Sequence, residues 1–187
     1  MPDPAAAAIA TKDIVGWSAT GAGLIATYVW NFYNRAHTNR LGRELRRDAF
    51  KFDEWKAKRA ALQSRLQDFE GAGTRISALT RGAHDVSGLR TEVAKLGLDL
   101  TMAHEALIRE LKRTAPGWDA LAFGRSQGSE SDWDSINTVL ADVAVDGDDP
   151  SALRTRLAAI SPFIASIGEL IVERIHAATA EHDPERI

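Results

Sequence analysis

The feature that most constrains this chain is a run of 21 residues without a charged side chain, from Ile14 to Asn34. A helix of that length rises about 31 Å, close to the thickness of the hydrocarbon core of a bilayer. Trp17 lies near one end of the run, and Trp30 and Tyr33 lie near the other, at the levels where aromatic rings prefer the lipid headgroups. The run therefore predicts one membrane-spanning helix over residues 14–34, with these three residues as its anchors.

Positive charge is concentrated after this run. Only Lys12 precedes it, whereas five arginines follow it closely: Arg35, Arg40, Arg43, Arg46 and Arg47. The positive-inside rule then predicts that residues 1–13 lie outside the cell's inner membrane and that the rest of the chain is cytoplasmic. A secretory signal carries its positive charge first, so we expect an uncleaved anchor. The arginines either only set this topology or also attract anionic headgroups of the bilayer.

The composition of the run leaves a second interpretation open. Glycine, serine and threonine dilute its hydrophobicity, so that insertion lies near the threshold on per-residue scales. A glycine-rich helix buried in a soluble oligomer is the alternative. One face of the run carries a small-xxx-small pattern that permits close packing of two helices: Ala19, Gly23, Ala26 and Thr27. This pattern favours a homo-oligomer that associates through the span.

A long amphipathic helix is predicted over residues 35–70. Its apolar residues recur at alternating spacings of three and four and form one stripe: Leu45, Phe52, Trp55, Leu62, Leu66 and Phe69. Gly71 and Gly73 predict the end of this helix. A second helix over 74–113 keeps the same kind of stripe, so residues 35–113 are expected to form a helical hairpin, or a coiled coil between protomers.

The C-terminal region, residues 114–187, is punctuated by turn and cap signals. Ser131 with Asp134, Asp149 with Pro150, and the pair at 161–162 each predict the start of a short helix. No stretch shows the sustained alternation of a strand. The expected fold is therefore all-α: a transmembrane helix that continues into a hairpin or coiled-coil stalk, followed by a small helical bundle.

Composition narrows the function classes. The chain has no cysteine, which excludes disulfides and thiolate chemistry, and its net charge of −3 argues against nucleic acid as a partner. It contains no phosphate-binding glycine loop, nucleophile elbow or dinucleotide fingerprint. Glu173 and His176 have the spacing of a di-iron ligand pair, but a second pair is lacking. We therefore expect no enzyme, no cofactor and no metal site.

One short segment resembles a known site. In the sequence from Gly82 to Gly88, His84 is followed by an apolar residue two positions on and by a glycine four positions on. This resembles the phosphoacceptor segment of histidine phosphotransfer domains, which are helical bundles, and the resemblance implies that His84 accepts a phosphoryl group. The segment departs from that family at Ser87, and at the bulky residues from Leu89 onward.

The overall layout predicts an interaction protein. A span followed by a basic long helix is similar to anchored stalk proteins such as the ATP synthase peripheral stalk, although the glycines at 71 and 73 depart from that pattern. Trp118, in a proline-glycine loop, is the predicted contact for an unidentified protein partner. The expected function is that of a membrane-anchored scaffold or signalling accessory. The alternatives are a membrane-active effector that oligomerises through its span, and a phosphotransfer module that uses His84.

Overall fold

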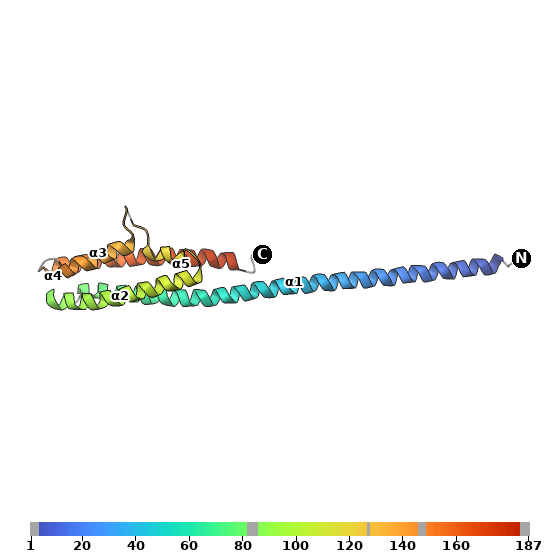
Figure 1. The fold of residues 1–187 in the computed structure, drawn as a ribbon, viewed down its shortest axis with the longest axis horizontal. Coiled ribbons are helices and arrows are strands. Elements are labelled where there is room, and N and C mark those ends of the chain that lie inside the picture. The colour runs from blue at the N-terminus through green and yellow to red at the C-terminus, as the bar shows by residue number, and fades with distance from the viewer. Residues whose placement is uncertain (1–3, 82–85, 127, 146–148, 184–187) are drawn as a thin grey trace. The chain divides into compact units, whose positions relative to one another are not determined.

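The computed structural model describes residues 4–81, 86–126, 128–145 and 149–183, with side chains from residue 27 onward except at 86, 87, 144 and 145. The described residues are all helical or irregular and contain no strand, which confirms the predicted all-α class. Figure 1 shows the elements in chain order: α1 (Pro4–Ala78), η1 (Leu79–Arg81), α2 (Val86–Thr114), η2 (Trp118–Phe123), α3 (Asp132–Val145), α4 (Pro150–Ala158) and α5 (Ile160–His182).

The chain divides into two units, Met1–Phe50 and Lys51–Ile187, and α1 contributes to both. In unit 1 the structure describes side chains from residue 27 to residue 50. All of these are exposed except Gly42 and Asp48, which are half-buried. Unit 1 therefore has no hydrophobic core within its described side chains.

Unit 2 is a helical bundle built on the part of α1 from residue 51 to residue 78. Arg75 pairs with Asp99 on α2, at 3.8 Å, and Phe69 lies 5.8 Å from His104, ring centroid to ring centroid. As the residue number rises on α1 it falls on α2, so the two helices are antiparallel. Helix α3 packs on α2 and α5, and α4 precedes α5 along the same side of the bundle (Figure 1).

The core of unit 2 confirms the predicted stripe from residue 55 onward. Trp55, Leu62, Leu66 and Phe69 are buried, whereas Leu45 in unit 1 is exposed. The other helices complete the core with buried side chains: Leu89, Leu100, Leu107, Leu111, Ile136, Leu153, Leu157, Ile160, Ile167, Ile171 and Ile175. The apolar faces of the four helical segments therefore meet inside one unit.

The predicted helix end at Gly71 and Gly73 is wrong, because α1 continues through both residues to Ala78. A Cβ atom added to Gly73 would lie 2.0 Å from Cδ1 of Ile164, so this glycine lets α5 approach α1 closely. Consequently the second helix does not begin at residue 74. Helix α2 begins at Val86, and the connection between the two helices falls at residues 79–85, of which 82–85 lie outside the described residues.

Two of the three predicted helix starts in the C-terminal region are confirmed. The Ser131 hydroxyl accepts a hydrogen bond from the amide of Asp134 at 3.2 Å, and the Asp149 carboxylate accepts one from the amide of Ser151 at 2.9 Å. Pro150 is the first residue of α4, where its missing N–H has no consequence. The third start is wrong: α5 begins at Ile160 without a side-chain cap, and Ser161 instead accepts a hydrogen bond from Ser77.

One described helical run, Pro150–His182, is long and apolar enough to cross a membrane by length and composition. Its apolar residues lie in the core of unit 2, and the core helix of a soluble bundle passes the same test, so the evidence for a span there is weak. The predicted span at 14–34 falls within α1. Its side chains from 14 to 26 lie outside the described residues.

Candidate functional site

The described end of the predicted span exposes a dense group of apolar and aromatic side chains. These side chains are between 59% and 75% exposed: Tyr28, Val29, Trp30, Phe32 and Tyr33. Large contiguous apolar patches of this kind are rare on soluble monomers and mark surfaces that bind protein or lipid. The predicted anchors Trp30 and Tyr33 belong to this group, and the side chain of Trp17 lies outside the described residues. Of the predicted packing residues, Thr27 is described and exposed, whereas Ala19, Gly23 and Ala26 lie outside the described side chains.

The five predicted juxtamembrane arginines, Arg35, Arg40, Arg43, Arg46 and Arg47, are all exposed. Three of them make contacts within their own helix. Arg40 pairs with Glu44 at 3.0 Å, Arg43 donates to the carbonyl of Asn39 and Arg46 donates to the carbonyl of Gly42. Such exposed contacts stabilise a helix by less than about 1 kcal/mol each. The guanidinium groups therefore remain at the surface, where they can meet anionic headgroups.

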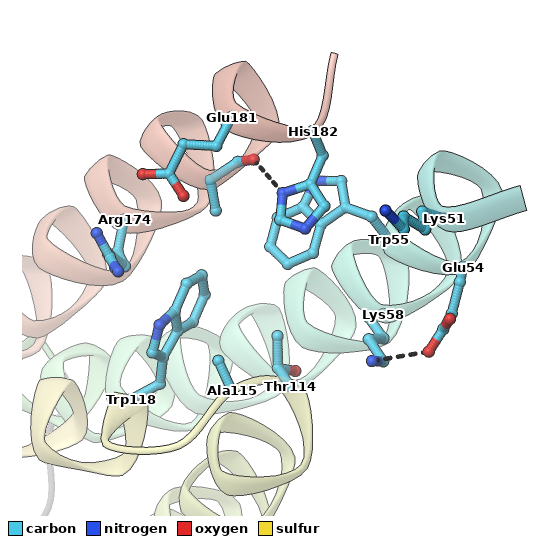
Figure 2. A pocket seen from close by; sticks show the side chains of 11 residues that line it. Lys51, Glu54, Trp55, Lys58, Thr114, Ala115, Trp118, Arg174, Glu181 and His182 are labelled. Atoms are coloured by element: carbon cyan, nitrogen blue, oxygen red, sulfur yellow. Dashed lines mark hydrogen bonds and ion pairs between the residues drawn. The ribbon is translucent and has the colours of Figure 1, made fainter. Parts of the chain in front are cut away.

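A cavity of about 270 Å³ lies in unit 2 where α1, the end of α2, η2 and α5 meet (Figure 2). The indoles of Trp55 and Trp118 form its base, packed edge to face with their centroids 5.9 Å apart. Trp55 donates from Nε1 to the hydroxyl of Thr179 at 3.2 Å, and the ring of His182 stacks on its face at 5.0 Å. The base of this aromatic pocket is therefore held in place from α1, η2 and α5 together.

Charged side chains of both signs form the rim of the aromatic pocket. Lys58 pairs with Glu54 at 2.9 Å, and the guanidinium of Arg174 lies 5.3 Å from the ring centroid of Trp118. Lys51 and Glu181 complete the rim. Opposite charges on one rim create no uniform field for an inorganic anion or a cation. Among the residues that the structure describes, no group of three or more His, Cys, Asp or Glu side chains is placed to hold a metal ion.

Trp118 is more enclosed than its loop position predicts. It is 6% exposed and opens η2 directly after Gly117, whose φ of 82° is a left-handed conformation that suits glycine. A partner can reach this indole only through the mouth of the aromatic pocket, and the predicted contact stays a prediction. The sequence gave no sign that Arg174 and His182 would join it, because these residues are far from Trp118 along the chain.

A second group that the sequence did not predict surrounds His104 inside unit 2. The imidazole is 2% exposed, donates from Nε2 to the carbonyl of Ala122 at 2.8 Å, and stacks on Trp133 with the ring centroids 3.6 Å apart. Burial lowers the pKa of His104, because the interior disfavours its charged form, and the hydrogen bond to Ala122 opposes this shift. The neutral ring ties η2 to α2 and is closed to solvent, so it serves the fold.

The acidic stretch of the C-terminal region is largely used by the fold as well. Asp132 is buried and accepts a hydrogen bond from the amide of Arg125 at 3.2 Å. Asp149 caps α4, and Asp142 lies 3.7 Å from Arg156. Few of these carboxylates are therefore left for a basic partner. His84, the residue of the phosphotransfer hypothesis, lies outside the described residues.

No family model, curated protein or solved structure matches this chain. The functional argument therefore rests on the geometry of the two units and on the sequence.

Proposed function

We propose that this protein is a single-pass membrane protein whose helical bundle binds other proteins at the cytoplasmic face. In this proposal residues 14–34 cross the inner membrane, residues 1–13 lie outside it, and unit 2 is cytoplasmic. The observation that carries the proposal is the exposed aromatic and apolar group at residues 28–33, which directly precedes the arginines that begin at Arg35.

The direction of these exposed side chains favours lipid over a protein cover. Consecutive residues of a helix point about 100° apart, so Tyr28, Val29 and Trp30 face three different directions. A partner helix covers one face, whereas lipid surrounds a helix on every side. Burying five such side chains is worth on the order of 10 kcal/mol, which is large enough to hold a marginal span in the bilayer.

The bundle supports the second half of the proposal. Its described residues offer an aromatic pocket with a mixed-charge rim, and the buried histidine is closed to any substrate. Aromatic residues with arginine at their edge are the side chains that most often dominate protein–protein binding. The proposed partner is therefore a protein segment that places an apolar side chain in the pocket and charged groups on its rim.

A matched pair of substitutions tests the anchor. Leu24→Arg puts a charge at the middle of the proposed span, where insertion costs roughly 2.5–3.5 kcal/mol more. Phe50→Arg adds the same side chain at an exposed apolar position outside the span. After alkaline carbonate washing of membranes, the wild type and Phe50→Arg should stay in the pellet and Leu24→Arg should be lost. Recovery of all three proteins in the supernatant would contradict the anchor.

Topology is tested with reporters fused to the C-terminus. A reporter that is active only in the cytoplasm should be active, and one that requires export should be silent. The opposite pattern would contradict the orientation set by the arginines.

The binding role is tested by photo-crosslinking in membranes. A photoreactive amino acid at Lys51, on the rim of the aromatic pocket, should give a discrete adduct. The same group at Arg109, exposed on α2 outside the pocket, should give none. Equal labelling from both positions, or from neither, would contradict a binding role for the pocket.

A further inference from the structure

Helix α1 carries one seam of positions at alternating spacings of three and four residues. From Trp55 onward these positions face the core of unit 2, and nearly all are buried: Trp55, Leu62, Leu66, Phe69, Gly73 and Ile76. The same register, counted backward along α1, passes through Asp48, Leu45, Leu41 and Thr38. There the leucines are 46% and 70% exposed. The seam that unit 2 covers by itself therefore continues into unit 1 without a cover.

The seam also runs into the predicted span. Leu41 follows Gly23 by 18 residues, and Leu45 follows Thr27 by the same number. At 3.6 residues per turn this is about five full turns, so Gly23 shares a face with Leu41, and Thr27 shares it with Leu45. These are the small positions that permit close packing of helices in lipid. One face of α1 thus changes from small residues to leucines between residues 27 and 41.

This change matches what each solvent requires of a helix pair. In lipid, helices associate by close packing at small residues, whereas in water they associate by burying apolar side chains. The arginines at 40, 43, 46 and 47 lie on the side of the helix opposite the leucines, so they do not meet across the seam. We propose that a second copy of this chain covers the face formed by Gly23, Thr27, Leu41 and Leu45, in a parallel dimer with both helices in register.

A second copy fits this face better than another occupant does. A partner helix must change from small to apolar residues at the same depth as α1, and an identical chain anchored in the same direction does so. Lipid alone accounts for the exposed residues at 28–33 but not for leucines confined to one face after the span. The dimer rests on the proposed anchor, because two leucines per chain bury too little area in solution and the membrane supplies the effective concentration.

Asp48 sets the C-terminal limit of the proposed interface. It is the next seam position after Leu45 and is half-buried. In a parallel dimer the two Asp48 carboxylates approach each other, which is unfavourable for like charges. Beyond this point the seam residues enter the core of their own bundle. The interface is therefore short, and Asp48→Leu should lengthen it.

Disulfide trapping tests the dimer directly, because the chain has no native cysteine. Single cysteines are placed in the full-length protein at Leu41 and Leu45 on the seam, and at Arg43 and Arg47 on the opposite side, and membranes are oxidised. A disulfide needs Cβ atoms within about 4.5 Å, so seam positions should give roughly ten-fold more covalent dimer than the controls. Gly23→Ile should reduce trapping at Leu41→Cys several-fold, whereas Gly21→Ile, on another face, should not.

Carbonate washing of the same membranes separates this inference from the proposed function. A membrane-bound protein that traps equally on both faces, or only with a different protein, overturns the dimer and leaves the anchor. A soluble protein that still traps at Leu41 and Leu45 overturns the anchor and leaves the seam. A soluble protein without trapping overturns both.

Discussion

Helix α1 places two stretches of similar periodicity in different surroundings. In unit 1, Leu45 is 70% exposed, and in unit 2, Leu62 is 0% exposed, although both stand on the same seam of the same helix. The stripe therefore states that a face needs a cover and does not state what provides it. In unit 2 the cover is α2, α3 and α5 of the same chain. In unit 1 the proposed covers are lipid and a second copy.

The largest effect should separate two phenylalanines of α1. Phe69 is fully buried and contacts the rings of His104 and Trp133, so Phe69→Ala should lower the free energy of unfolding by about 3–5 kcal/mol. Phe50 is 70% exposed, and Phe50→Ala should change it by less than about 0.5 kcal/mol. Urea unfolding of the full chain in detergent, followed by circular dichroism, measures both. Equal losses would mean that Phe50 is covered by the protein itself.

Two glycines of α1 should respond to alanine with opposite signs. Gly71→Ala meets nothing within 4 Å and should stabilise the helix by about 1 kcal/mol. Gly73→Ala forces the side chain of Ile164 to move, which should cost about 1–3 kcal/mol of unfolding free energy. Thermal unfolding of the two variants measures the difference. Stabilisation by both would show that α5 does not approach α1 at residue 73.

The cap of α4 should have a smaller and strictly local effect in unit 2. Asp149→Ala removes the acceptor of the Ser151 amide and should lower the free energy of unfolding by about 1 kcal/mol. Asp149→Asn keeps an acceptor and should recover most of this loss. Urea unfolding measures both. An alanine variant as stable as the wild type would show that solvent replaces the cap.

The smallest effect should be a pH dependence that belongs to unit 2. Burial lowers the pKa of His104, so below its ordinary value of 6.5 the unfolded chain binds a proton that the folded chain resists. The free energy of unfolding should therefore fall as the pH drops from 7 to 5. His104→Gln, which keeps a donor for the Ala122 carbonyl, should flatten this slope. An unchanged slope would assign the pH dependence to other groups.

Local signals predicted much of this fold. The caps at Ser131 and Asp149 and the proline at position 150 depend on atoms a few residues apart, so the sequence contains all that they need. The stripe predicted that Trp55, Leu62 and Phe69 are core residues. The helix end at Gly71 and Gly73 was predicted wrongly, because a glycine that ends a helix and one that admits a neighbouring helix look alike in sequence.

The candidate sites divide in the same way. The arginines after residue 34 and the aromatic residues before it were visible in the sequence, because they lie on one continuous segment. The aromatic pocket was not, since Trp55, Trp118 and His182 come from three elements and meet only in the bundle. Trp118 was singled out for its loop, yet its environment comes from α1 and α5.

The amino-acid sequence by itself determined the helical class, the position of the uncharged run, the charge that follows it and the local caps, since each depends on neighbours within one or two turns. The tertiary structure alone decided where α1 ends, which of its seam residues are covered, and which aromatic and histidine rings stack. Those outcomes depend on which faces of distant helices meet, and helical periodicity records that a face is apolar without recording its partner.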